Sequence, residues 1–78
     1  LKAHQLNEAA DHMQRLLALE PQNVDAMLML SDIYGSMRRY DKAAEFAWQA
    51  LKVAPDNTVA LQRLYLYSRG LEAPTEQP

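Results

Sequence analysis

The chain has 78 residues, a hydrophobic share of 49%, a charged share of 23% and a formal net charge of −2. A chain of this length holds at most one small domain with a modest core. The absence of cysteine excludes disulfides, zinc thiolate sites and thiol catalysis. The near-neutral charge predicts no nucleic-acid partner, and the lack of a run of roughly 18 apolar residues predicts no membrane contact from this segment.

The spacing of apolar residues predicts a first helix from about residue 2 or 3 to Leu19. Its apolar positions recur at intervals of three and four, which places them on one stripe. They are Leu6, Ala9, Ala10, Met13, Leu16 and Leu17. Pro21 should end this helix near Glu20, because a residue before proline is pushed away from the helical region.

A second helix is expected from Asn23 to about Ser36. The Asn23 side chain can accept a hydrogen bond from the unpaired amides of the first turn, and Asp25 places a negative charge near the positive end of the helix dipole. The side expected to be buried carries Ala26, Met27, Leu30, Ile33 and Tyr34.

Two further helices complete the predicted set. The third runs from about Tyr40 to Val53, ends before Pro55, and should bury Tyr40, Ala43, Ala44, Phe46 or Ala47, Ala50 and Leu51. The fourth begins after a cap at Asp56 or Asn57 and carries Ala60, Leu61, Leu64, Tyr65 and Tyr67. It should end at Gly70, since glycine suits the left-handed conformation past a helix end. Residues 71–78 contain two prolines and are expected to form a tail or linker.

Two stretches of the chain match each other at a fixed shift. Leu6 to Asn23 aligns with Tyr40 to Asn57, and Pro21 and Pro55 are 34 residues apart. The matched pairs include Ala9 with Ala43, Ala10 with Ala44, Asp11 with Glu45, Leu17 with Leu51, Leu19 with Val53, and Asn23 with Asn57. A period in this range is typical of a stacked repeat protein.

The one complete unit, Val24 to Asn57, has a pattern of small and aromatic residues. The pattern consists of Leu30, Ser31, Tyr34, Tyr40, Ala43, Ala47, Ala50 and Pro55, and it resembles a tetratricopeptide repeat. The resemblance implies an all-α fold in which antiparallel helical hairpins stack as an α-α superhelix, here a solenoid fragment of about four helices. It implies a repeat domain over residues 1–70, with one full repeat at about 24–57 between two half repeats.

The chain departs from the family pattern in three places. Met27 and Leu61 stand where a large aromatic residue is usual early in the first helix of a unit, and both suit a core. The turn between the two helices of a unit usually has a glycine late in the turn, whereas Gly35 here precedes Ser36-Met37-Arg38-Arg39. Tyr65 replaces the small residue equivalent to Ser31, so the last helix should splay or act as an end cap.

The resemblance also implies a binding surface, because the first helix of each unit lines a concave groove in this family. Carried over to this sequence, the partner-binding residues are Asp25, Leu28, Met29, Asp32, Gln62, Arg63, Leu66 and Arg69. One subset of the family binds acidic chaperone tails through lysine, asparagine and arginine in this groove. Leu28 and Asp32 stand where those groups are needed, and a carboxylate repels an acidic tail, so we do not expect that ligand.

The function expected from the resemblance is protein–protein interaction, with a peptide or helix of a partner held in the groove. The alternative is a structural spacer or a homo-oligomerisation unit, including a homodimer, because the first helix has no hairpin partner and leaves an apolar stripe uncovered. The sequence contains no phosphate loop, no nucleophile with its base and no paired catalytic carboxylates, so no enzymatic activity and no cofactor are expected.

Three other groups of residues have a weaker claim to function. His4, Glu8 and His12 share a helical face with a spacing that metal ligands use, but a solvated face is favoured and no metal is expected. Arg38, Arg39 and Lys42 form a basic cluster that is interpreted as a solvated turn. Trp48 is either an exposed interface anchor or partly buried against a neighbouring repeat.

The chain begins in mid-repeat and without methionine. We therefore expect that the N-terminus of a longer parent protein precedes it, with the cytoplasm as the default location of this segment.

Overall fold

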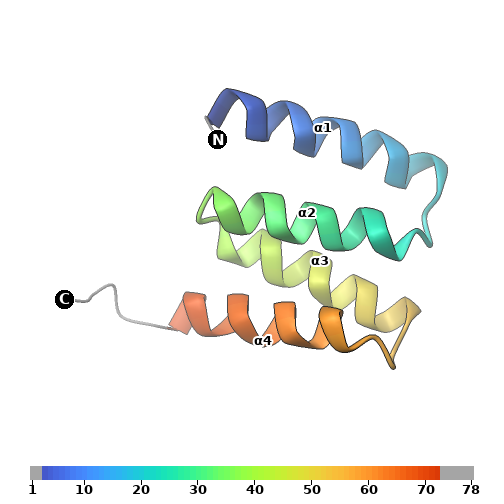
Figure 1. Cartoon of the computed structure of the whole chain (residues 1–78), viewed down its shortest axis with the longest axis vertical. Coiled ribbons are helices and arrows are strands. Elements are labelled where there is room, and N and C mark those ends of the chain that lie inside the picture. Colours follow the sequence, from blue (N-terminus) through green and yellow to red (C-terminus); the bar gives the residue numbers. More distant parts are fainter. Residues whose placement is uncertain (1–2, 73–78) are drawn as a thin grey trace.

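The structure, a computed structural model, describes residues 3–72, and all regular structure in that range is helical. The helices are α1 (Ala3–Leu19), α2 (Val24–Ser36), α3 (Tyr40–Val53) and α4 (Thr58–Glu72). Each helix packs against the one before it, in alternating directions (Figure 1). The predicted all-α fold of stacked antiparallel hairpins is confirmed. The tail expected within residues 71–78 lies mostly outside the described residues.

The two turns that follow the prolines have the same construction. The Asn23 side chain accepts a 2.9 Å hydrogen bond from the backbone N–H of Ala26, and the Asn57 side chain accepts a 3.0 Å bond from Ala60. Both bonds satisfy an amide that the first helical turn leaves unpaired. The predicted cap at Asn23 is confirmed, and of the two candidates for α4 the cap is Asn57.

The turn between α2 and α3 places a non-glycine residue in the left-handed region. Arg38 has a φ of 61°. Its N–H donates to the carbonyl of Gly35 at 3.0 Å, and the N–H of Arg39 donates to that of Tyr34 at 2.9 Å. These two bonds form a Schellman motif, in which the residue at the Arg38 position is usually glycine. The turn therefore keeps the common geometry without the common residue.

Small residues at the joints create the core. Ala43, Ala47 and Ala50 of α3 are fully buried, and so is Leu30 of α2. Without bulk at the alanines, α2 and α3 approach closely enough for the Ser31 hydroxyl to donate a 2.7 Å bond to the carbonyl of Ala43. This bond gives the one fully buried polar side chain of α2 a partner, as burial requires.

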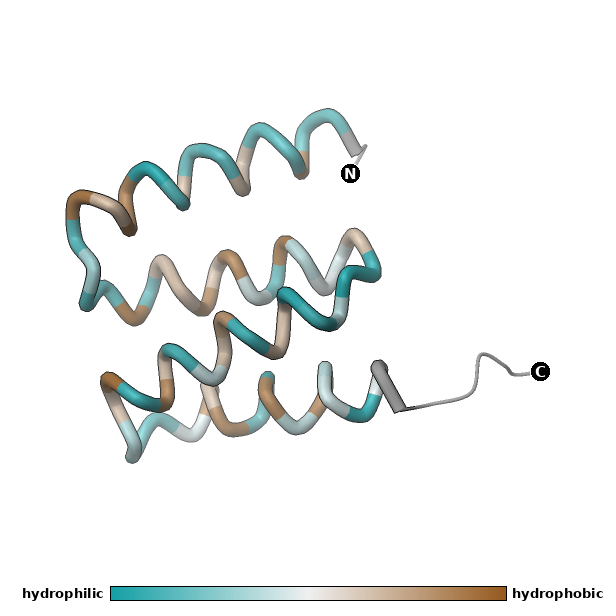
Figure 2. Tube along the Cα trace, turned by 180° about the vertical axis from the view of Figure 1, so that it is seen from behind, coloured by the Kyte–Doolittle hydropathy of each residue, from teal (hydrophilic) through white to brown (hydrophobic). Residues whose placement is uncertain are grey.

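Aromatic residues extend the core toward α1. The Tyr34 ring stacks on Phe46 with centroids 5.8 Å apart, and its hydroxyl accepts a 2.7 Å bond from Gln14 of α1. The hydrophobic side of α1 is turned toward α2, and its other side is hydrophilic (Figure 2). Leu6 and Ala10 are its buried residues.

The expectations for α4 need two corrections. Gly70 does not end α4, because the helix continues to Glu72 and no described glycine has a positive φ. Leu61 and Tyr65 were expected among the core-compatible residues, but they are 57% and 64% exposed. Their side of α4 has no helix among the described residues to cover it, whereas Ala60 is buried against α2 and α3.

Candidate partner-binding groove

The groove predicted between α2 and α4 is joined by a polar contact. The Arg63 guanidinium of α4 donates a 2.7 Å bond to Oδ1 of Asp32 on α2, and the Tyr67 hydroxyl donates a 2.9 Å bond to the same oxygen. Asp32 and Arg63 are both predicted groove residues. The structure pairs them with each other across neighbouring repeats.

A glycine allows the close approach of α4 to α2 at this contact. The Tyr67 ring lies against Gly35, where an added Cβ atom would overlap the ring atoms Cε1 and Cζ. Gly35 lies inside a helix, where glycine costs stability relative to alanine. The space that it leaves for the ring is the reason for its presence, and it allows the Tyr67 hydroxyl to reach Asp32.

The environment of Tyr67 changes its acidity. Partial burial of the phenol, the hydrogen bond to Asp32 and the negative charge of that carboxylate raise the pKa of Tyr67 from 10.0 to about 12. Each of these disfavours the phenolate. Tyr67 is therefore a neutral hydrogen-bond donor at physiological pH.

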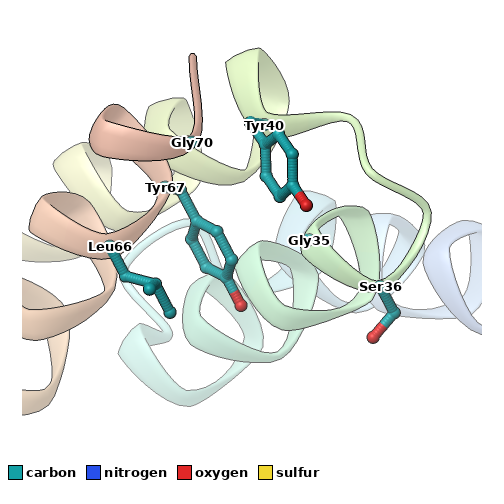
Figure 3. Close-up of a pocket in the computed structure, with 6 residues that line it drawn as sticks. All are labelled: Gly35, Ser36, Tyr40, Leu66, Tyr67 and Gly70. Carbon is teal, nitrogen blue, oxygen red and sulfur yellow. The ribbon is translucent and has the colours of Figure 1, made fainter. Parts of the chain in front are cut away.

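A hollow of about 300 Å³ opens beside this contact (Figure 3). Its apolar wall consists of Leu66, Tyr67 and Tyr40, and the two tyrosine rings stack with centroids 6.1 Å apart. Ser36 borders the hollow, and Gly35 and Gly70 line it without side chains. Its volume lies at the lower end of the range of about 300–1,000 Å³ for ligand pockets, which suits one or two side chains of a peptide.

The remaining predicted groove residues lie around this contact in different environments. Met29 and Leu66 are 51% and 55% exposed. Leu28 is partly buried and packs against the core near Met27. Arg69 lies over the ring of Tyr65, with its guanidinium carbon 5.4 Å from the centroid. The exposed residues Asp25 and Gln62 complete the set.

Sequence reasoning did not assign Gly35, Tyr40, Tyr67 and Gly70 to the groove. Tyr40 and Tyr67 were expected only as packing residues. One available signal was Gly35, because an isolated glycine within a helical pattern usually has a packing reason. Which helix approached it depended on a contact between residues more than 30 positions apart.

The other candidates lie away from the groove. Trp48 on α3 is 52% exposed. His4 and Glu8 form an exposed pair at 3.3 Å, and within residues 3–72 no three histidine or acidic side chains are placed to hold a metal ion. Arg39 lies over the Tyr34 ring at 5.5 Å. None of the described helices is long and apolar enough to span a membrane.

The fold and the groove define a class of protein. Antiparallel hairpins that repeat every 34 residues, with small residues at the joints, are characteristic of helical repeat proteins. The family model described as Tetratricopeptide repeat matches residues 1–65. The chain belongs to the tetratricopeptide repeat family, whose repeats generally mediate protein–protein interaction and are typically not catalytic.

Proposed function

We propose that this chain binds a peptide or helix of a partner protein in the groove between α2 and α4. The observation that supports the proposal most directly is the hollow beside Leu66, where apolar and aromatic side chains meet a tyrosine hydroxyl and a carboxylate. An apolar side chain of the ligand enters this hollow. Shape and a few anchors supply the affinity, as in other peptide-binding grooves.

The Asp32 carboxylate adds a polar contact for the ligand. Both bonds from α4 go to Oδ1, and the side chain remains 47% exposed. Oδ2 therefore has room for a donor such as a peptide N–H or a lysine of the ligand. Because Arg63 already neutralises much of the carboxylate charge, a single lysine contributes less here than beside an unpaired carboxylate.

Selection from a library of short random peptides tests the groove directly. A selected peptide should shift the amide resonances of α2 and α4 around Leu66 in an NMR titration of the labelled chain. Two leucines on different sides of α4 provide a matched pair of variants, because Leu66 is 55% exposed and Leu61 is 57% exposed.

Leu66→Glu should weaken the selected peptide by at least about tenfold, since it places a carboxylate at the apolar wall of the hollow. Leu61→Glu makes the same chemical change on the other side of α4 and should leave the affinity within about twofold. Equal losses in the two variants, or resonance shifts confined to α1 and α3, contradict the groove.

Self-assembly as a structural or oligomerisation unit is the second function, and the exposure of Leu61 and Tyr65 favours it. Large apolar side chains that lie together on an uncovered helix face commonly mark an interaction surface. Sedimentation velocity over a concentration series tests this function: an average mass that rises with concentration supports it, and a monomer throughout contradicts it.

A further inference from the structure

The 34-residue period identifies an uncovered surface on α4. Met27 and Ser31 are the residues of α2 that face α3, and they are 3% and 0% exposed. The residues 34 positions later are Leu61 and Tyr65, which are 57% and 64% exposed. This surface, with Ser68 one turn further on, is the end face. It is the α4 version of the face through which α2 binds α3.

Trp48 borders the same uncovered position. Gln14, 34 residues earlier, lies on α1 at a hollow that it shares with Lys42 and Phe46 of α3. By the repeat, Trp48 of α3 borders the position of the helix that would follow α4. Trp48 is 52% exposed. A helix on the end face would therefore contact Trp48 as well as Tyr65.

The helix that fills the equivalent position inside the molecule is α3. It does so with three alanines, Ala43, Ala47 and Ala50, all fully buried. The residues 34 positions earlier are Ala9, Met13 and Leu16 of α1, and each is only partly buried. These three residues are the α1 face. The sequence of α1 is thus the chain's own counterpart of α3, with its matching face uncovered.

The charges of the two helices are complementary. Between Thr58 and Gly70 the sequence has two arginines and no acidic residue, whereas α1 carries Glu8 and Asp11. Glu8 is the counterpart of Lys42, whose ammonium lies 6.0 Å from the Tyr34 ring centroid. Tyr34 corresponds to Ser68, the neighbour of Arg69. An α1 helix on the end face would therefore bring Glu8 toward Arg69.

We infer that the end face of one copy of this chain receives the α1 face of a second copy, in a head-to-tail joint that continues the repeat stack between molecules. The inference rests on the self-assembly function proposed above and specifies its two surfaces. Because the surfaces differ, each added copy leaves one of each kind open, and the assembly grows as a chain of molecules. Tyr65 is larger than Ser31, so the two helices lie farther apart than α2 and α3.

Two blocked variants test the joint on the 78-residue chain. Tyr65→Glu charges the end face, and Leu16→Glu charges the α1 face; neither residue belongs to the buried core. In sedimentation velocity, the unaltered chain should increase in mass with concentration beyond a dimer. Each variant alone should be monomeric, and an equimolar mixture should form a 1:1 dimer through the two intact faces.

Leu66→Glu is the matched control, because it adds the same charge to the groove side of α4 and should leave the association within about twofold. Circular dichroism checks that each variant keeps its helices. If the unaltered chain associates but the mixture stays monomeric, the joint is wrong while self-assembly stands. A dimer that grows no further and is lost in Tyr65→Glu alone indicates pairing between two end faces and also overturns the joint. A monomeric unaltered chain contradicts both.

Discussion

Arg63 and Asp32 form the ion pair that joins α4 to α2, with 2.7 Å between the guanidinium Nε and the carboxylate Oδ1. The side chains are 33% and 47% exposed, so solvent screens the pair and its contribution to stability is modest. The Tyr67 hydroxyl shares the same oxygen. The position of α4 relative to the complete repeat therefore depends in part on one carboxylate of the groove.

Asp32→Asn should lower the free energy of unfolding by about 0.5–1 kcal/mol, because the amide keeps an acceptor but loses the charge that strengthens both bonds. Urea unfolding followed by circular dichroism measures the change. Glu45→Gln on α3 is the control, since it removes an exposed carboxylate with no ion-pair partner in the described structure. Equal losses in the two variants would mean that the bonds to Asp32 add nothing to stability.

The raised pKa of Tyr67, about 12, predicts a pH dependence with a definite sign. The folded state holds the phenol proton more tightly than the unfolded chain does. The stability linked to this group is therefore complete below about pH 10 and is lost as the pH rises from about 10 to about 12.

A tyrosinate absorbance titration of the chain, after subtraction of the same titration of Tyr67→Phe, isolates this group. The difference curve should have its midpoint near 12. In Asp32→Asn the midpoint should move down, because the charge and the charged hydrogen-bond acceptor are lost, although the desolvation of the ring remains. A midpoint that does not move in that variant would assign the whole rise to burial.

Local signals in the sequence were sufficient to predict the four helices. Apolar spacing, the prolines at 21 and 55 and the asparagine caps all act within a few residues. The fixed 34-residue shift then supplied the order in which the helices stack. The end of α4 was predicted wrongly because Gly70 was taken as a helix terminator, whereas it lies in the helix facing the Tyr40 ring, with space for a Cβ atom 3.1 Å away.

The groove was harder to predict than the fold. The repeat pattern could place Asp32 and Arg63 on the same surface, but it could not show that they pair, since a pair depends on side-chain rotamers and on the separation of the helices. Tyr67 was missed for the same reason, because its position beside Gly35 is a property of two surfaces together. The exposure of Leu61 and Tyr65 followed from which helices are present, and their residue types carry no signal for it.

Gly35→Ala should destabilise the chain by about 1 kcal/mol, although alanine is the better helix former by a similar amount. The added Cβ atom overlaps the Tyr67 ring, so the ring must leave its site and lose its bond to Asp32, at a combined cost of about 2 kcal/mol. Thermal unfolding measures the net effect.

Two further variants separate the clash from the change in helix propensity. Gly70→Ala should be close to neutral, because its Cβ atom would lie 3.1 Å or more from the Tyr40 ring. In a Tyr67→Ala background the clash is absent, and Gly35→Ala should then stabilise the chain by about 0.5–1 kcal/mol. If Gly35→Ala has the same sign in both backgrounds, the ring does not depend on the glycine.

Arg38→Gly should stabilise the chain by about 0.5–1 kcal/mol. A residue with a Cβ atom pays roughly 1–2 kcal/mol in the left-handed conformation, and Arg38 adopts it with a φ of 61°. Glycine removes that cost but gains freedom in the unfolded chain, which returns part of the benefit. Arg38→Ala is the control, because it removes the same charged side chain and keeps the backbone strain, so the free energy of unfolding should change by less than about 0.5 kcal/mol. Urea unfolding of the three chains decides between the two effects: stabilisation in glycine alone assigns it to the backbone, whereas equal stabilisation in both variants assigns it to the loss of the arginine from its basic cluster.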